Sequence, residues 1–229
     1  MKLFAERSAI VEYGKKLLSS QLTTGSGGNL SIFNRQEGLV AIKPSGVSYD
    51  GMGPEHMVLV DLTGAVVEGD LRPSSDTPTH LELYRAFPGL RGVAHTHSTY
   101  ATAWAQAKRP LPCYGTTHAD SFYGAVPVTA DLTPEALRGD YELETGRAIV
   151  AAFAALDALQ VPGVLVAGHG PFTWGTSAAK AVENSLVLEQ VAEMAVLTEA
   201  LEPDAGPIDQ LLLDKHFLRK HGGGAYYGQ

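Results

Sequence analysis

Apolar and polar residues follow two different periods along the chain, one typical of helices and the other typical of strands. Apolar side chains three and four positions apart predict a helix over residues 3–20. The same spacing over residues 177–201 predicts the longest helix, with one buried stripe. That stripe consists of Ala178, Ala181, Val182, Ser185, Leu188, Ala192 and Ala195. Short apolar runs that end at Gly, Pro or polar turn residues lie between these two helices and are typical of strands.

Six segments predict strands, and two more predict helices. The strands cover residues 30–33, 39–46, 57–61, 63–69, 92–97 and 163–170, the last of them running into a polar turn. One helix is expected within residues 73–87, with Thr77 as N-cap and Pro78 as the first helical residue, and another over residues 98–107. Because the early strands are short and joined by turns, we expect an α/β sandwich whose central sheet is largely antiparallel or mixed.

The composition fits one globular domain over residues 1–229, being 45% hydrophobic and 18% charged with no repeat or linker. A formal net charge of −8 disfavours nucleic acid and anionic membranes as partners, but not a small anionic substrate. The single cysteine, Cys113, excludes an intramolecular disulfide. No segment approaches the roughly 20 apolar residues of a membrane span, and the first residues lack the apolar core of a signal peptide. We therefore expect a cytoplasmic protein.

His95 and His97 form the most distinctive local pattern. They stand two positions apart in a predicted strand, where side chains at i and i+2 point to the same face. Two such imidazoles can chelate one ion, and catalytic zinc commonly takes three protein ligands. His169 is the third candidate, because it follows another apolar strand between two glycines, and Asp76 is a candidate oxygen ligand. The spacing alone leaves ordinary hydrogen-bonding histidines open as an alternative, since the chain has five other histidines.

Three segments rich in glycine and serine offer backbone N–H groups to an anion. They are Gly28–Asn29 after a glycine-rich turn, Ser45–Gly46 at the end of a strand, and Ser74–Ser75 before a helix. The segment 23–29 matches neither the Walker A loop nor the dinucleotide-binding glycine motif, so a nucleotide is not indicated. Turn formation alone is an alternative explanation for each segment taken singly.

Nine segments, in this order, carry a resemblance to a known family. They are GGN at 27–29, KPSGV at 43–47, VVEG at 66–69, PSSDTPTH at 73–80, HTHS at 95–98, GTTHADSFYG at 115–124, GVLVAGHGPF at 163–172, LLDKHFLRKHG at 212–222 and YYGQ at 226–229. Through them the chain resembles, nearly end to end, the L-ribulose-5-phosphate 4-epimerases, which belong to the superfamily of class II, fuculose-phosphate-type aldolases.

The resemblance implies the α/β sandwich of that superfamily and a homotetramer with active sites at subunit interfaces. It implies zinc, or another divalent ion such as Mn²⁺ or Co²⁺, bound by His95, His97 and His169 with Asp76 in or near the coordination sphere. The phosphate of a small phosphosugar would be held by Gly28, Asn29, Ser45, Gly46, Ser74 and Ser75. Asp120 and Tyr227 would be the two proton-transfer groups, with Tyr227 delivered from a neighbouring subunit.

The expected reaction interconverts L-ribulose 5-phosphate and D-xylulose 5-phosphate by breaking and re-forming the C3–C4 bond. One alternative is an aldolase such as fuculose-1-phosphate aldolase, in which Glu would stand at the position of Asp76. A second alternative is a non-catalytic aldolase-like interaction module, as in adducin head domains. The pathway stays open between L-arabinose and L-ascorbate breakdown, as do the roles of Lys43, Glu142 and His216.

Overall fold

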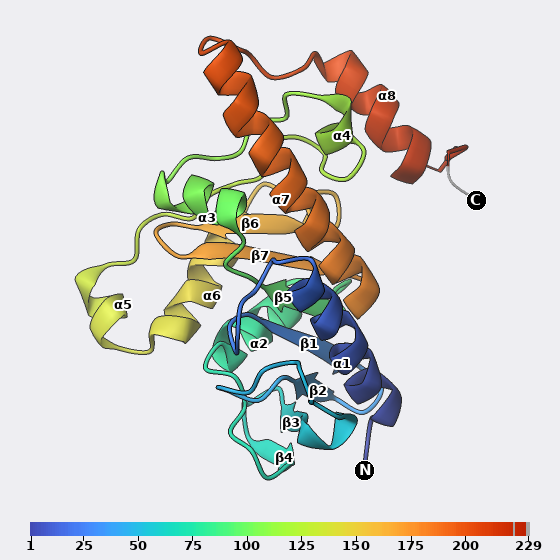
Figure 1. The fold of residues 1–229 in the computed structure, drawn as a ribbon, viewed down its shortest axis with the longest axis vertical. Helices are drawn as coiled ribbons and strands as arrows, with labels where there is room; N and C mark the ends of the chain where they lie inside the picture. Colours follow the sequence, from blue (N-terminus) through green and yellow to red (C-terminus); the bar gives the residue numbers. More distant parts are fainter. Residues whose placement is uncertain (222, 228–229) are drawn as a thin grey trace.

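The computed structural model describes residues 1–221 and 223–227, and within these ranges it contains a seven-stranded sheet flanked by helices (Figure 1). The strand order is β4-β3-β2-β1-β5-β7-β6, and every neighbouring pair is antiparallel. The strands are β1 (Asn29–Asn34), β2 (Leu39–Ile42), β3 (Val58–Asp61), β4 (Val66–Glu68), β5 (Gly92–His95), β6 (Gly163–Val166) and β7 (Gly170–Gly175). The expected α/β sandwich with a largely antiparallel sheet is therefore confirmed.

The helices lie between and after these strands in the chain. They are α1 (Phe4–Ser19), α2 (Thr77–Ala86), α3 (Thr99–Gln106), α4 (Thr116–Ala119), α5 (Pro134–Arg138), α6 (Tyr141–Ala152), α7 (Ala178–Leu201) and α8 (Gln210–His221), with a 3-10 turn η1 at Pro54–His56. None of these helices combines the length and the hydrophobicity that crossing a membrane would require.

Hydrophobic cores lie on both faces of the sheet because alternate residues of a strand point to opposite sides. In β2, Val40 and Ile42 join the core that contains α2, whereas Leu39 and Ala41 join the core that contains α1. Helix α7 contributes to both cores, its first turns to one and its later turns to the other. All seven residues of the predicted α7 stripe are buried, so that prediction is confirmed.

Four of the predicted element boundaries are wrong. Thr77 is the first residue of α2 and not its N-cap, which is Asp76; the Thr77 hydroxyl instead donates to the carbonyl of Ser74 at 2.6 Å. The strand expected over residues 92–97 ends at His95, because the chain then turns into α3. The expected strands over 39–46 and 63–69 are likewise shortened, to β2 and β4.

The helices α4, α5, α6 and α8 and the strand β7 were not predicted. Strand β7 begins with Gly170 and Pro171, a pair typical of turns, yet it pairs with β5 on one side and β6 on the other. Helix α6 packs closely against α2 at Gly146, where an added Cβ would lie 3.1 Å from Cα of Thr79. The Thr79 hydroxyl also donates to the carbonyl of Glu142 at 2.5 Å, which fixes the first turn of α6 beside α2.

Candidate functional site

Three histidines converge where β5 ends and β7 begins. His95 is the last residue of β5, His97 follows two positions later, and His169 lies in the turn between β6 and β7. Because β5 and β7 are neighbours, with His95 opposite Phe172, the turn before β7 lies beside the end of β5. One ring nitrogen of each histidine lies within 4.8 Å of those of the other two. These three nitrogens could hold a divalent metal ion.

His95 is held with one nitrogen free for such an ion. Its ring is buried and stacks on Phe172 at a centroid distance of 4.2 Å, and Nδ1 donates to the carbonyl of Pro171 at 2.9 Å. Burial and the neighbouring His169 and His97 lower the pKa of His95 well below its usual value, so the ring is neutral. With the proton on Nδ1, the lone pair of Nε2 faces Nε2 of His97, 2.9 Å away. A neutral imidazole is the form that binds metals.

His169 is held by a different group. Its Nδ1 lies 3.0 Å from the hydroxyl oxygen of Tyr141, the first residue of α6. Burial lowers the pKa of His169, although the charge of Asp76 opposes this. The neutral ring is therefore favoured here as well. His97 differs from both, because its side chain is exposed.

Asp76 lies at the border of the histidine cluster. Its Oδ2 is 4.0 Å from Nε2 of His95 and accepts a hydrogen bond of 2.6 Å from Nδ2 of Asn29, the first residue of β1. Asn29 was predicted from the sequence to hold phosphate. Its side-chain amide donates one hydrogen bond to Asp76, the candidate metal ligand. Asp76 thus lies beside the cluster, but it is not one of the three residues whose ligand atoms lie within 4.8 Å of one another.

A cavity of about 290 Å³ brings together all the residues that the sequence assigned to metal and phosphate. They line it together with five others: Gly28, Asn29, Ser45, Gly46, Ser74, Ser75, Asp76, His95, His97 and His169, with Ser26, Gly27, Lys43, Tyr141 and Glu142. The histidines and the glycine- and serine-rich segments thus face one space. Lys43 and Glu142 had no role assigned from the sequence, and Tyr141 was missed because no motif marks it.

Backbone contacts join the segments around Ser45 and Ser74, whereas the Gly28 segment lies against the end of β5. The N–H of Ser74 donates to the carbonyl of Lys43, and the N–H of Ser45 donates to the carbonyl of Arg72. Gly28 has a φ of 65°, and an added Cβ would lie 2.9 Å from the carbonyl oxygen of His95. Only glycine therefore fits this approach to the end of β5.

Lys43 is the buried cation of the cavity. Its ammonium donates to the carbonyl of Ser26 at 2.9 Å and to that of Pro44 at 3.2 Å, so it braces the glycine-rich turn. Burial lowers the pKa of Lys43 to about 8. The ammonium is thus mostly charged at pH 7, and it loses its charge as the pH rises through about 8.

Asp120 and Tyr227 lie together but are not among the described residues that line this cavity. Asp120 ends α4 and accepts from His216 at 3.0 Å, from Arg219 at 3.0 and 3.1 Å, and from Lys220 at 3.1 Å. Burial alone would raise the pKa of Asp120, but these hydrogen bonds hold it below its usual value. The carboxylate is therefore ionised at neutral pH.

Tyr227 packs on the same cations. Arg219 lies over its ring at 4.4 Å and Lys220 at 5.0 Å, and the Tyr227 side chain is 54% exposed. Helix α8 thus joins the two residues that the sequence assigned to proton transfer within a single chain. The last two residues of the YYGQ segment and Gly222 lie outside the described residues.

The chain is similar to one known family and to several solved structures. Residues 8–196 match the family model of the class II aldolase and adducin N-terminal domain. An L-fuculose 1-phosphate aldolase structure is 27% identical, with a TM-score of 0.79 over 93% of this chain and 94% of that chain. The L-fuculose-1-phosphate aldolase of Thermus thermophilus is 26% identical, with a TM-score of 0.68 over 90% of this chain and 100% of that chain. YgbL from Klebsiella pneumoniae, described by the alternatives aldolase, epimerase and decarboxylase, is 27% identical, with a TM-score of 0.74 over 92% and 97%.

Proposed function

Because this chain belongs to the class II aldolase and adducin N-terminal domain family, we propose that it is a metal-dependent enzyme that interconverts L-ribulose 5-phosphate and D-xylulose 5-phosphate. The observation that carries the proposal is the shared cavity, in which three converging imidazoles face backbone and hydroxyl donors suited to phosphate. A cytoplasmic location and a single domain over residues 1–229 belong to the same proposal.

The residues at one end of the cavity fit a divalent ion. His95, His97 and His169 offer three nitrogens, and Asp76 adds an oxygen at the border. Zinc suits this set, and Mn²⁺ or Co²⁺ is the alternative. Such an ion would act as a Lewis acid on the carbonyl and adjacent hydroxyl oxygens of the ketose.

Another part of the cavity wall suits the phosphate. Gly28, Gly46 and Ser75 are among its lining residues, and Lys43 supplies the positive charge behind the glycine-rich turn. An anion held there would fix the position of C5 of a pentulose 5-phosphate. The sugar carbons would then extend toward the histidines, so the phosphate would fix the substrate and the histidine-bound ion would activate it.

Inversion at C4 needs two proton-transfer groups. One group removes the proton of the C4 hydroxyl while the C3–C4 bond breaks and its electron pair passes to the ketose fragment. The aldehyde fragment, glycolaldehyde phosphate, turns to present its other face, the bond re-forms, and the second group returns a proton to the C4 oxygen. Asp120, held as a carboxylate by α8, suits the base, and the Tyr227 phenol suits the acid.

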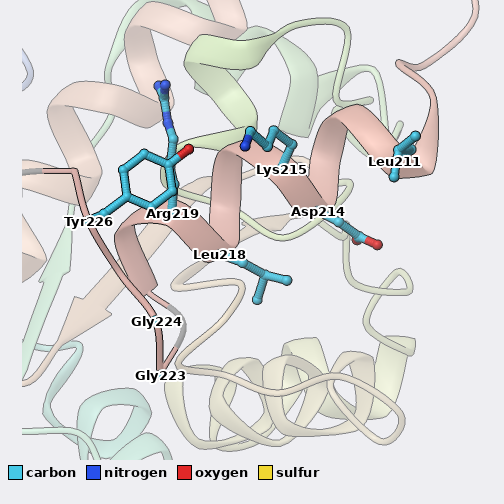
Figure 2. Close-up of a pocket in the computed structure, with 8 residues that line it drawn as sticks. All are labelled: Leu211, Asp214, Lys215, Leu218, Arg219, Gly223, Gly224 and Tyr226. Atoms are coloured by element: carbon cyan, nitrogen blue, oxygen red, sulfur yellow. The ribbon is translucent and has the colours of Figure 1, made fainter.

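We further propose that a neighbouring copy of the chain supplies Asp120 and Tyr227 to the cavity, within a homotetramer. Their separation from the cavity in one chain supports this. The C-terminal part also exposes apolar side chains, including Met194, Leu197 and Leu201 of α7. Leu211 and Leu218 of α8, with Tyr226 after this helix, line an open cavity of about 400 Å³ (Figure 2). A second copy of this chain would cover this surface.

An aldolase that releases its aldehyde is the second candidate. The names of two similar structures favour it, since both are L-fuculose 1-phosphate aldolases. The aspartate at position 76, together with Asp120 just after α4 and Tyr227 after α8, favours the epimerase. A non-catalytic module is disfavoured by the complete histidine set.

One assay separates these candidates. Purified protein loaded with zinc is incubated with L-ribulose 5-phosphate, and D-xylulose 5-phosphate and glycolaldehyde phosphate are followed together, with and without a chelator. We expect xylulose phosphate to form without free aldehyde and only when metal is present. Accumulating aldehyde would establish an aldolase. Turnover of L-fuculose 1-phosphate in place of the pentulose phosphate would overturn the substrate.

A further inference from the structure

The hydrogen bond between His169 and Tyr141 distinguishes His169 from the other two histidines. His95 is oriented by the backbone carbonyl of Pro171, which no side-chain substitution removes. In the described part of the chain, the ring nitrogens of His97 have no hydrogen-bond partner besides Nε2 of His95. Of the three, His169 alone is oriented by a side chain from outside the histidine cluster, since its Nδ1 lies 3.0 Å from the Tyr141 hydroxyl.

The position of Tyr141 is fixed by its own helix and by α2. The Thr145 hydroxyl donates to the carbonyl of Tyr141 at 2.9 Å, one turn later in α6. The next residue, Glu142, is tied through its carbonyl to Thr79 of α2. Close packing at Gly146 holds the two helices together beyond that point. The phenol is therefore placed by a rigid pair of helices.

The direction of this hydrogen bond decides which nitrogen of His169 can bind a cation. A neutral imidazole carries one proton, so a proton on Nδ1 leaves the lone pair on Nε2, toward the other histidines. A phenol oxygen can accept a hydrogen bond from that Nδ1–H while its own hydrogen points elsewhere. A free imidazole with no such partner divides its proton between the two nitrogens.

We propose that Tyr141 is a positioning residue whose hydroxyl oxygen accepts a hydrogen bond from Nδ1–H of His169 and thereby presents Nε2 of His169 to the divalent ion. The inference rests on the proposed metal-dependent function, and it adds to that function a residue outside the ligand set. Partners of this kind fix the tautomer and ring orientation of metal-binding histidines, and their loss costs roughly 10- to 100-fold in metal affinity.

Tyr141→Phe tests the proposal, because it removes the hydroxyl and keeps the ring. The matched control is Tyr114→Phe, which removes a phenol that donates to Glu199 at 2.7 Å, outside the cavity. Cobalt titration with visible absorption measures affinity for the metal alone, without turnover. ¹⁵N NMR of the metal-free proteins reports which His169 nitrogen carries the proton. Thermal unfolding checks that both variants fold as the wild type does.

We expect Tyr141→Phe to bind Co²⁺ roughly 10- to 100-fold more weakly and to move the His169 proton from Nδ1 toward Nε2, while Tyr114→Phe matches the wild type. Equal Co²⁺ affinity of Tyr141→Phe and wild type would overturn the proposal. An unchanged His169 tautomer would overturn it as well. A wild-type protein that binds no Co²⁺ would instead overturn the metal site itself. Failure of the inference and failure of the proposed function are thereby distinguished.

Discussion

Asn29 and Asp76, 47 positions apart in the sequence, are joined by a hydrogen bond of 2.6 Å from the amide Nδ2 to the carboxylate Oδ2. The contact links the first residue of β1 to the N-cap of α2, so it ties the sheet to the helix at the border of the histidine cluster. The amide thereby orients a carboxylate that lies beside the three histidines.

Replacing this donor by an acid should disable the site. In Asn29→Asp two carboxylates face each other at hydrogen-bond distance, where both cannot be ionised, so one of them takes up a proton. We expect kcat/KM at pH 8 to fall by at least roughly 100-fold, with partial recovery toward pH 6 as the shared proton binds more fully.

The control for this change lies at the other end of the same strand. Nδ2 of Asn34 donates to a carboxylate oxygen of Glu6 at 2.7 Å, far from the cavity in β1. Asn34→Asp should keep wild-type kcat/KM across the same pH range. Equal losses in the two variants would mean that the Asn29–Asp76 contact has no special role.

Removing His97 should remove the metal without unfolding the protein. The His97 side chain is exposed, so His97→Ala should change the free energy of unfolding by no more than about 0.5 kcal/mol. We expect the purified variant to lack stoichiometric zinc by elemental analysis and to lack turnover. His56→Ala, outside the cavity, is the control and should retain both. Normal zinc content in His97→Ala would contradict the proposed ligand set.

Lys43 should give substrate binding a pH dependence near pH 8. Because burial lowers the pKa of this ammonium to about 8, the free protein loses the charge as the pH rises through that value. A phosphate group binds the charged form more tightly, so KM for L-ribulose 5-phosphate should rise above pH 8. A charged hydrogen bond is worth about 1.5–3 kcal/mol, which corresponds to roughly 10- to 100-fold in KM.

Lys43→Met provides the check on this assignment. Its KM at pH 7 should already resemble the wild-type value at high pH and should stay flat from pH 7 to 9. If KM of Lys43→Met rose near pH 8 as it does in the wild type, the titrating group would not be Lys43.

Asp120 and Tyr227 should matter for turnover but not for metal binding. Asp120→Asn and Tyr227→Phe each remove one proton-transfer group while the histidine cavity stays intact. We expect kcat to fall by roughly 100-fold or more in each variant, in line with the contribution of general acid–base catalysis. Zinc content should remain that of the wild type, and its loss would count against these roles.

Mixed oligomers test whether these groups act across subunits. Asp120→Asn keeps an intact cavity, and His97→Ala keeps an intact Asp120, so each variant alone should be inactive. If the cavity of one copy meets Asp120 of the next, hybrids formed by co-expression should recover up to roughly a quarter of wild-type activity. No recovery in verified hybrids would show that each site is built within one chain.

The contacts of Asp120 with the basic residues of α8 should also affect the stability of the fold. The folded-state pKa of Asp120 is below its usual value, because hydrogen bonds from α8 outweigh the effect of burial. Its contribution to stability is thus present above about pH 4 and is lost as the pH falls further. Asp120→Asn should flatten the acid side of the thermal stability curve, measured by unfolding temperature between pH 3 and 7.

Local pattern predicted much of the fold correctly. The apolar spacing of α1 and α7 and the apolar runs of β1, β2, β3, β5 and β6 were recognised because their side chains repeat with the period of the element they form. Strand β7 and helix α6 were missed, since Gly170–Pro171 is typical of turns and the start of α6 is rich in charge. Their structure depends on pairing with β5 and β6 and on packing against α2.

The sequence by itself determined which residue types could form a metal and phosphate site, since ligand atoms, glycine freedom and the pairing of His95 with His97 are properties of the residues and their spacing. Tertiary structure decided which of the eight histidines meet, because antiparallel pairing of β5 with β7 sets the His169 turn beside His95. It also placed Tyr141 behind His169 through the contact of α6 with α2, and it set Asp120 among the cations of α8 away from the cavity. Contacts between residues distant in sequence depend on how elements pack, and no local spacing encodes them.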